Sequence, residues 1–191
     1  QARGVALGDR ETIRLLMQVL LLSGIGMTIA GGSYPASQAE HMIAHTYNML
    51  AEHQQKAFDT LHGEEVGVTT LHMAKRQEEL LRRPPRLKPF DFSEENMTAL
   101  FGAHAAREAK RAFSIKQALA EKARISKDSW DKIVRRIEEI RMPPARIETI
   151  LKQAEAPQTI EDLGWDRETY AVAEDHARYL RDRFTCLDLE V

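Results

Sequence analysis

Apolar residues recur along most of the chain with the three-to-four-residue spacing of amphipathic helices. The clearest example is 126–142, where Trp130, Ile133, Ile137 and Ile140 fall near one helical face. No stretch alternates in the way of a half-buried strand, and no strand–helix–strand rhythm is present. The pattern therefore predicts an all-α domain over residues 1–191, a bundle of about seven or eight helices. The expected helices are 10–29, 37–52, 64–81, 93–101, 103–122, 126–142, 146–154 and 167–183, followed by an apolar tail at 184–191.

The longest apolar run is 15–30, and it is the one segment that suggests a membrane span. Such a span needs about 20 mostly apolar residues, whereas Gln18, Ser23 and Thr28 interrupt this run and several glycines thin it. Glycines also allow neighbouring elements to approach closely. We therefore expect a core helix buried at the centre of the domain, and no membrane association.

Composition narrows the class of protein further. With 43% hydrophobic and 29% charged residues in 191, the chain has the composition of an ordinary globular domain. The 27 basic residues nearly balance the 29 acidic ones, which gives no electrostatic reason to expect nucleic acid as a partner. The single cysteine, Cys186, excludes an internal disulfide and favours a cytoplasmic location. No G-x-G-x-x-G turn and no phosphate-binding loop occur, so we expect no dinucleotide site in these residues.

The candidate chemistry lies with the histidines, four of which fall between residues 41 and 62. His41 and His45 are four residues apart on a predicted helix, so they share a face and could grip one divalent ion. His62 precedes Gly63 at a predicted helix start, where the positive end of the helix favours a neutral, ligating imidazole. The alternative is that these side chains pack, cap or face solvent. We expect such ordinary roles for His53, His72, His104 and His176, and for Cys186.

Three motifs together resemble one family. Residues 32–45, GSYPASQAEHMIAH, resemble the Ser-x-Pro-Ala-Ser-Gly-x-Glu-His-x-x-Ser-His signature of the sn-glycerol-1-phosphate dehydrogenases. Residues 61–71, LHGEEVGVTTL, are similar to that family's Leu-His-Gly segment, and residues 181–189, RDRFTCLDL, to its closing Arg-Asp-Arg-Tyr-Thr tail. The resemblance is in order and spans about residues 10–191. The wider superfamily contains the iron-containing alcohol dehydrogenases, the glycerol dehydrogenases and dehydroquinate synthase.

The resemblance implies a fold and a site. The chain would be the helical carboxy-terminal domain of a dehydroquinate synthase-like fold, and an amino-terminal Rossmann-like domain outside these residues would bind NAD(P). By motif position, His41 and His62 would be two ligands of a divalent metal, with zinc favoured and nickel or iron as alternatives. His45 would be a neighbouring catalytic residue. The third ligand, an Asp, is expected upstream of residue 1.

The implied function is that of an oxidoreductase that interconverts sn-glycerol 1-phosphate and dihydroxyacetone phosphate, and the isolated chain is expected to be inactive. Besides the substrate and the amino-terminal domain, a second copy of the chain is a candidate partner. Three departures leave the phosphate preference open: Tyr34 stands where the family often has Arg, Gln38 where it has Gly, and Ala44 where it has Ser. The alternatives are therefore a glycerol dehydrogenase-type polyol oxidoreductase, a dehydroquinate synthase-like lyase, or a non-catalytic helical module that retains the fold.

Overall fold

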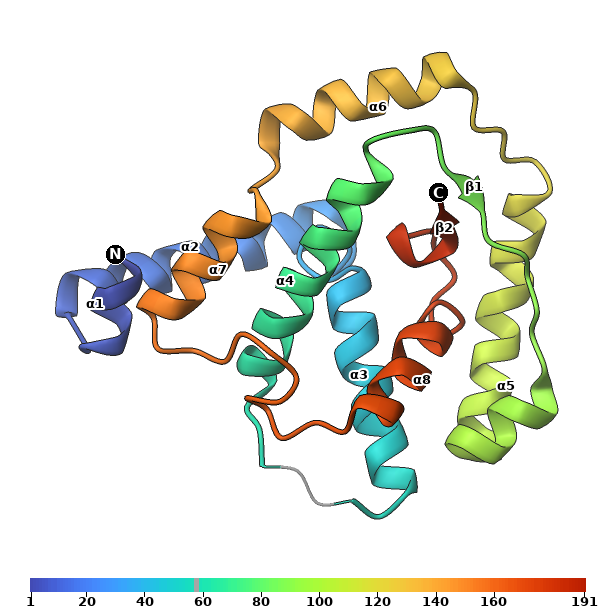
Figure 1. Cartoon of the computed structure of the whole chain (residues 1–191), viewed down its shortest axis with the longest axis horizontal. Helices are drawn as coiled ribbons and strands as arrows, with labels where there is room; N and C mark the ends of the chain where they lie inside the picture. Colours follow the sequence, from blue (N-terminus) through green and yellow to red (C-terminus); the bar gives the residue numbers. More distant parts are fainter. Residues whose placement is uncertain (57–58) are drawn as a thin grey trace.

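The computed structural model describes residues 1–56 and 59–191, and within them it confirms an all-α fold (Figure 1). A two-stranded antiparallel pair is the only sheet in this described part, with Arg86 opposite Glu190 and Leu87 opposite Leu189. A short 3₁₀ helix, η1, spans Cys186–Asp188. The elements are α1 (Ala2–Ala6), α2 (Arg10–Ala30), α3 (Ala39–His53), α4 (His62–Leu80), β1 (Arg86–Leu87), α5 (Glu94–Ala120), α6 (Lys127–Ile140), α7 (Pro144–Gln153), α8 (Arg167–Ala177), η1 and β2 (Leu189–Glu190).

Helix α3 lies at the centre of the core and contacts α4, α5 and α8. Ile43, Tyr47 and Leu50 recur at helical spacing on its inner face, and each is at most 3% exposed. Tyr47 stacks on Trp165, with ring centroids 3.9 Å apart, and its hydroxyl accepts from the Asp166 backbone N–H at 2.9 Å. The central position of α3 gives the face that carries His41 and His45 a rigid support.

Local chemistry explains where several helices begin and bend. The side chains of Asp9, Ser93 and Ser126 each accept a hydrogen bond from a backbone N–H three residues on, as expected of N-caps. The expected break between helices 93–101 and 103–122 is confirmed: α5 consists of two helical parts that meet at a kink at Gly102, whose φ of 80° and ψ of 162° are not helical and suit glycine. The second helix begins after Gln38 rather than after Ser37.

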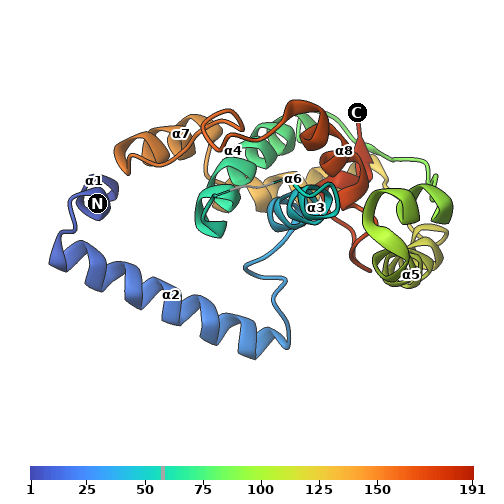
Figure 2. The same cartoon turned by 90° about the horizontal axis from the view of Figure 1, so that it is seen from below.

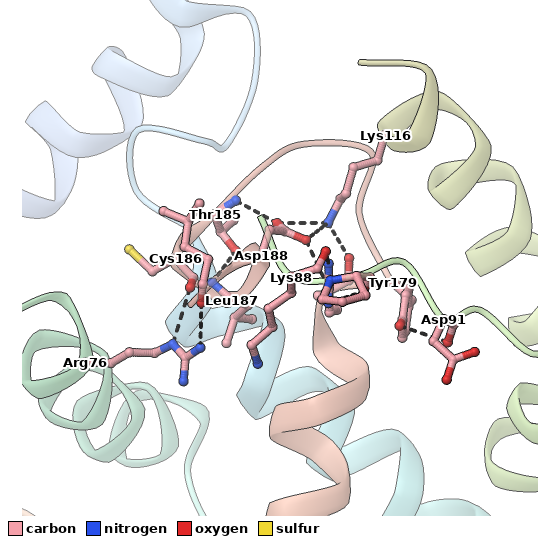
Figure 3. Close-up of polar contacts among 12 residues, drawn as sticks. Arg76, Lys88, Asp91, Lys116, Tyr179, Thr185, Cys186, Leu187 and Asp188 are labelled. Atoms are coloured by element: carbon pink, nitrogen blue, oxygen red, sulfur yellow. Dashed lines mark hydrogen bonds and ion pairs between the residues drawn. The ribbon is translucent and has the colours of Figure 1, made fainter. Parts of the chain in front are cut away.

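The final helix ends at Ala177, six residues earlier than expected, because the following segment turns back to bury Asp188 (Figure 3). Lys116 Nζ lies 3.0 and 3.1 Å from the two carboxylate oxygens of Asp188 and also donates to the carbonyl of Arg178. Arg178 Nε donates to the same carboxylate at 3.2 Å. Lys116 and Asp188 are both 0% exposed. Burial lowers the pKa of the Lys116 ammonium, although Asp188 acts in the opposite direction.

Further contacts join this buried carboxylate to its surroundings. The Thr185 backbone N–H donates to Asp188 at 2.9 Å, and the Arg178 guanidinium donates to the carbonyl of Pro89 at 3.1 Å. Arg76, on α4, donates to the carbonyls of Cys186 and Leu189 at 3.3 and 3.0 Å (Figure 3). The closing residues are therefore held by α4, α5 and the end of α8 at once.

The expectation that 15–30 forms a buried central helix is wrong. Helix α2 forms as predicted, but it has no buried residue, and Leu21, Leu22 and Ile29 are 64%, 66% and 82% exposed. It lies apart from the helical core (Figure 2), because the core around α3 is filled by α4, α5 and α8. In the described residues α2 alone is long and apolar enough to cross a membrane, a test that the core helix of a soluble protein also passes. The sequence of this segment correctly predicts an apolar helix, but it does not tell which surface, if any, covers that helix.

Replacing Asp188 by Asn should destabilise the domain by about 3–5 kcal/mol, because the buried Lys116 and Arg178 would lose their counter-charge. Urea unfolding followed by circular dichroism measures this change. The matched control is Asp175→Asn, the same chemical change at an exposed position, which should alter stability by less than about 0.5 kcal/mol. Equal effects of the two substitutions would contradict the role assigned to Asp188.

A second contact between helices should make stability depend on pH. Glu174 on α8 accepts from His72 on α4 at 3.1 Å and from Arg76 at 3.4 Å. The bond to His72 holds the pKa of Glu174 below its usual value, so the carboxylate stabilises the fold above the ordinary Glu pKa and loses this effect as pH falls through the folded value. Glu174→Gln should therefore cost about 1–2 kcal/mol near neutral pH. The difference should shrink in urea titrations below about pH 4, and a constant difference across that range would refute the linkage.

Candidate metal and substrate site

Three histidine rings converge where α3 meets the start of α4. The ring centroids of His41 and His62 are 5.5 Å apart, although residues 54–61 separate their helices in the chain. His45 stacks on His62 at 4.8 Å with an interplanar angle of 17°, and lies 6.2 Å from His41. The expectation that His41 and His62 come together is confirmed. Whether they bind a metal remains a prediction.

Each of the two predicted ligands is held through its Nδ1 atom by a carboxylate from its own helix. Glu40 lies 2.9 Å from His41 Nδ1, and Glu65 lies 3.2 Å from His62 Nδ1. Metal-ligating histidines characteristically donate their second ring N–H to a carboxylate or carbonyl, which leaves the other nitrogen free to ligate. The donor set therefore fits two imidazole ligands of a divalent ion.

The cluster is not a complete coordination shell. Over residues 1–56 and 59–191, no group of three or more His, Cys, Asp or Glu side chains is arranged to hold a metal ion. The three rings form an aromatic cluster in which His45 stacks face to face on His62. Stacked rings do not point their nitrogen atoms at one shared metal position. The arrangement fits two ligands better than three.

Glu65 and its partners are the part of the site that the sequence analysis missed. Glu65 is 1% exposed, and besides His62 it accepts from Asn48 Nδ2 at 2.9 Å and from Thr60 Oγ1 at 2.7 Å. The three-residue spacing of His62 and Glu65 on one helix was a usable signal. The sequence held no comparable signal for the pairing of Asn48 with Glu65, because only the packing of α3 on α4 brings these two residues together.

His45 faces a cleft. Two adjoining hollows of about 680 and 260 Å³ share the side chains of His45, Met49 and Arg181. The larger is also lined by Asn48 and Lys56. Desolvation lowers the pKa of His45, and the neighbouring His62, His41 and Arg181 lower it further, so the neutral imidazole is favoured. His45 can therefore accept or pass a proton at the edge of a polar cavity.

The two cations of the cleft differ in what they already bind. Lys56 Nζ donates to Thr169 at 2.9 Å and lies 3.9 Å from Asp166. Arg181 is exposed and forms no ion pair within the described part of the chain. Arg181 is therefore the cation of this cleft that is open to an anionic group.

The remaining histidines lie outside the cluster. His72 pairs with Glu174, and His176 bonds to the Val172 carbonyl at 2.8 Å. His104 lines the smaller hollow. Burial raises the pKa of the Cys186 thiol, which suits a packing residue better than a nucleophile.

Fold and site thus describe an all-α domain that carries clustered, carboxylate-supported histidines beside a cleft. No protein-family profile matches the chain. It is 45% identical over 73 residues to the glycerol-1-phosphate dehydrogenase [NAD(P)+] of Aeropyrum pernix, which covers 38% of this chain and 19% of the relative. The chain is also 41% identical over 70 residues to the enzyme of the same name from Pyrococcus furiosus, a match that covers 37% of this chain and 19% of the relative. It is 47% identical over 66 residues to the one from Geobacillus stearothermophilus, which covers 35% of this chain and 16% of the relative.

These relatives confirm the resemblance that the motifs suggested, for a part of the chain. The matched stretch spans less than one fifth of the length of each of these three relatives. The relatives carry the name of NAD(P)-dependent dehydrogenases. For this chain, the whole enzyme's activity is therefore a proposal.

Proposed function

We propose that this chain is the metal- and substrate-binding helical part of an NAD(P)-linked oxidoreductase that interconverts sn-glycerol 1-phosphate and dihydroxyacetone phosphate. The observation that carries the proposal is the convergence of His41 and His62 from two helices, each with Nδ1 held by a carboxylate. A helical module without this chemistry has no packing reason to place three imidazoles together beside a cleft. The names of the relatives point to the same reaction.

In this proposal the Nε2 atoms of His41 and His62 hold a divalent ion, for which zinc is favoured and nickel or iron are alternatives. A bound divalent ion would lower the pKa of the substrate hydroxyl and so assist hydride transfer to the nicotinamide. His45 is the neighbouring group that accepts or returns the hydroxyl proton. An Asp ligand and the NAD(P) site would come from an amino-terminal domain outside these 191 residues, in a cytoplasmic enzyme.

The exposed α2 supports a role within a larger assembly. Large exposed apolar patches mark surfaces that a partner covers, and the side chains of α2 are apolar nearly all round. The other domain of a longer protein or a second copy of the chain would cover this helix.

Arg181 favours a phosphate-bearing substrate over a plain polyol. The guanidinium group is the open cation of the cleft beside His45, and guanidinium groups recognise phosphate through two parallel hydrogen bonds. A glycerol dehydrogenase-type enzyme remains the second candidate, since Lys56 and Arg181 share their cleft with the acidic Glu52.

The isolated 191-residue chain should show no glycerol 1-phosphate oxidation, because placement of the hydride acceptor against the reacting carbon is worth on the order of 7–11 kcal/mol. A longer form with an upstream nucleotide-binding domain should reduce dihydroxyacetone phosphate when zinc or nickel is added. In that form His62→Ala should abolish turnover and leave nucleotide binding unchanged. Absorbance of the reduced nicotinamide measures turnover by both forms, and robust turnover by the isolated chain would disprove the proposal.

Substrate choice should depend on Arg181. In the longer form, Arg181→Gln should raise KM for dihydroxyacetone phosphate by about 10–100-fold, the equivalent of one lost charge-assisted hydrogen bond. Activity on unphosphorylated glycerol should stay the same. Arg107→Gln, at an exposed position of α5 that lines neither hollow, is the control and should have no effect. An unchanged KM in the Arg181 variant would favour the glycerol dehydrogenase alternative.

A further inference from the structure

The most completely buried charged side chain at the histidine cluster is Glu65, which the proposed reaction does not use directly. It projects from the first turn of α4 and is 1% exposed. Its two oxygens are fully engaged: Oε1 accepts from Thr60, and Oε2 accepts from Asn48 Nδ2 and lies 3.2 Å from His62 Nδ1. A buried carboxylate needs such partners, because an unpaired one would be costly.

The chemistry of these donors determines the state of the His62 ring. A carboxylate can only accept hydrogen bonds, so the hydrogen between Glu65 and His62 belongs to Nδ1 of the imidazole. A neutral imidazole carries one N–H, and a hydrogen at Nδ1 leaves the lone pair on Nε2. Nε2 is the atom that the proposed function assigns to the metal.

The same argument is weaker for His41. Its partner Glu40 is 20% exposed and divides its contacts between the ring and the backbone N–H of Gln38. Water can replace an exposed partner, whereas nothing in the buried setting of Glu65 can. The control over ring orientation is therefore concentrated at His62, whose own side chain is 48% exposed.

We propose that Glu65 is a positioning residue, anchored by Asn48 and Thr60, that holds His62 as the Nδ1–H tautomer with Nε2 presented to a divalent cation. This inference rests on the proposed metal-binding function for its purpose. The tautomer itself is a property of the metal-free chain.

Glutamine at position 65 separates this role from simple packing. Its amide oxygen can still accept from Thr60 or Asn48, and the side chain has nearly the same volume. With its oxygen on Thr60, its NH₂ group donates to Nδ1 of His62 and to Asn48, whose amide turns so that the otherwise unpartnered Oδ1 accepts, and His62 then carries its hydrogen on Nε2. Glu65→Gln should therefore leave the domain folded but remove the ligating lone pair.

The matched control is Glu64→Gln, which makes the same charge change one residue away. Glu64 accepts from the Leu61 backbone N–H at 3.1 Å and so serves the helix start rather than the His62 ring. A glutamine oxygen can accept the same bond. The two variants make the same change of charge, and only Glu65→Gln alters the contact with His62.

Two measurements on the 191-residue chain test the proposal. The first records imidazole nitrogen chemical shifts of the metal-free chain at a pH about two units above the ordinary His pKa. Wild type and Glu64→Gln should show Nδ1–H for His62, and Glu65→Gln should show Nε2–H. The second is calorimetric titration with Zn²⁺ alone, in which Glu65→Gln should lose about 10–100-fold in affinity and Glu64→Gln should match wild type.

The outcomes distinguish the inference from the function on which it rests. A wild-type His62 with its hydrogen on Nε2, or equal zinc affinity in wild type and Glu65→Gln, would overturn the positioning role. If wild type binds no zinc while the tautomers follow the expected pattern, the proposed metal function fails and the assignment of Glu65 to the ring stands. Circular dichroism of each variant confirms that the compared chains are equally helical.

Discussion

The buried carboxylate of Asp188 is the interaction on which the arrangement of the carboxy-terminal half depends. It is a fully buried charge neutralised by two cations, Lys116 from α5 and Arg178 from the end of α8. Breaking one partner of such a network would leave uncompensated charge in the core, which disfavours arrangements that separate Asp188 from Lys116 and Arg178. The intact network brings residues 178–188 back over the core and places Arg181 at the cleft beside His45. The structural network and the proposed substrate end of the site are therefore consecutive parts of one segment.

Much of the helical framework could be predicted from sequence, because local rules decide it. Ser126 caps the helix whose apolar spacing is the clearest in the chain, and His41 and His45 fall on one face of α3 as their spacing requires. The break in α5 at Gly102 could also be predicted, whereas the early end of α8 could not. The end of α8 depends on a tertiary contact, the bond between Lys116 of α5 and Asp188 of the closing segment.

The candidate site also has parts that the sequence could predict and parts that only the structure could reveal. The convergence of His41 with His62 was accessible only through the family resemblance, because no spacing rule links residues on two helices. The anchoring of Glu65 by Asn48 required the packing of α3 on α4 to be known. Helix α2 is a different case, because its sequence is clearly apolar but none of its side chains is buried by the part of the chain that the structure describes. Burial is a property of a surface and its partner together, and the sequence of one partner cannot supply it.

These observations bear on how a divided site can work. On the proposed function, the two histidines, with Nδ1 atoms held by Glu40 and Glu65, would lose little freedom on binding a cation. Two imidazoles alone would still leave a divalent ion with open positions, so the affinity expected from this half of the site is modest. On the proposed function, the remaining ligand and the nucleotide come from another domain, and cation binding then favours the state in which both halves meet. A cation favours the state in which the two domains meet only to the extent that it binds this state more tightly than the open one. On the proposed function, Glu65 keeps the His62 lone pair available, so it would contribute to the meeting of the domains as well as to metal affinity.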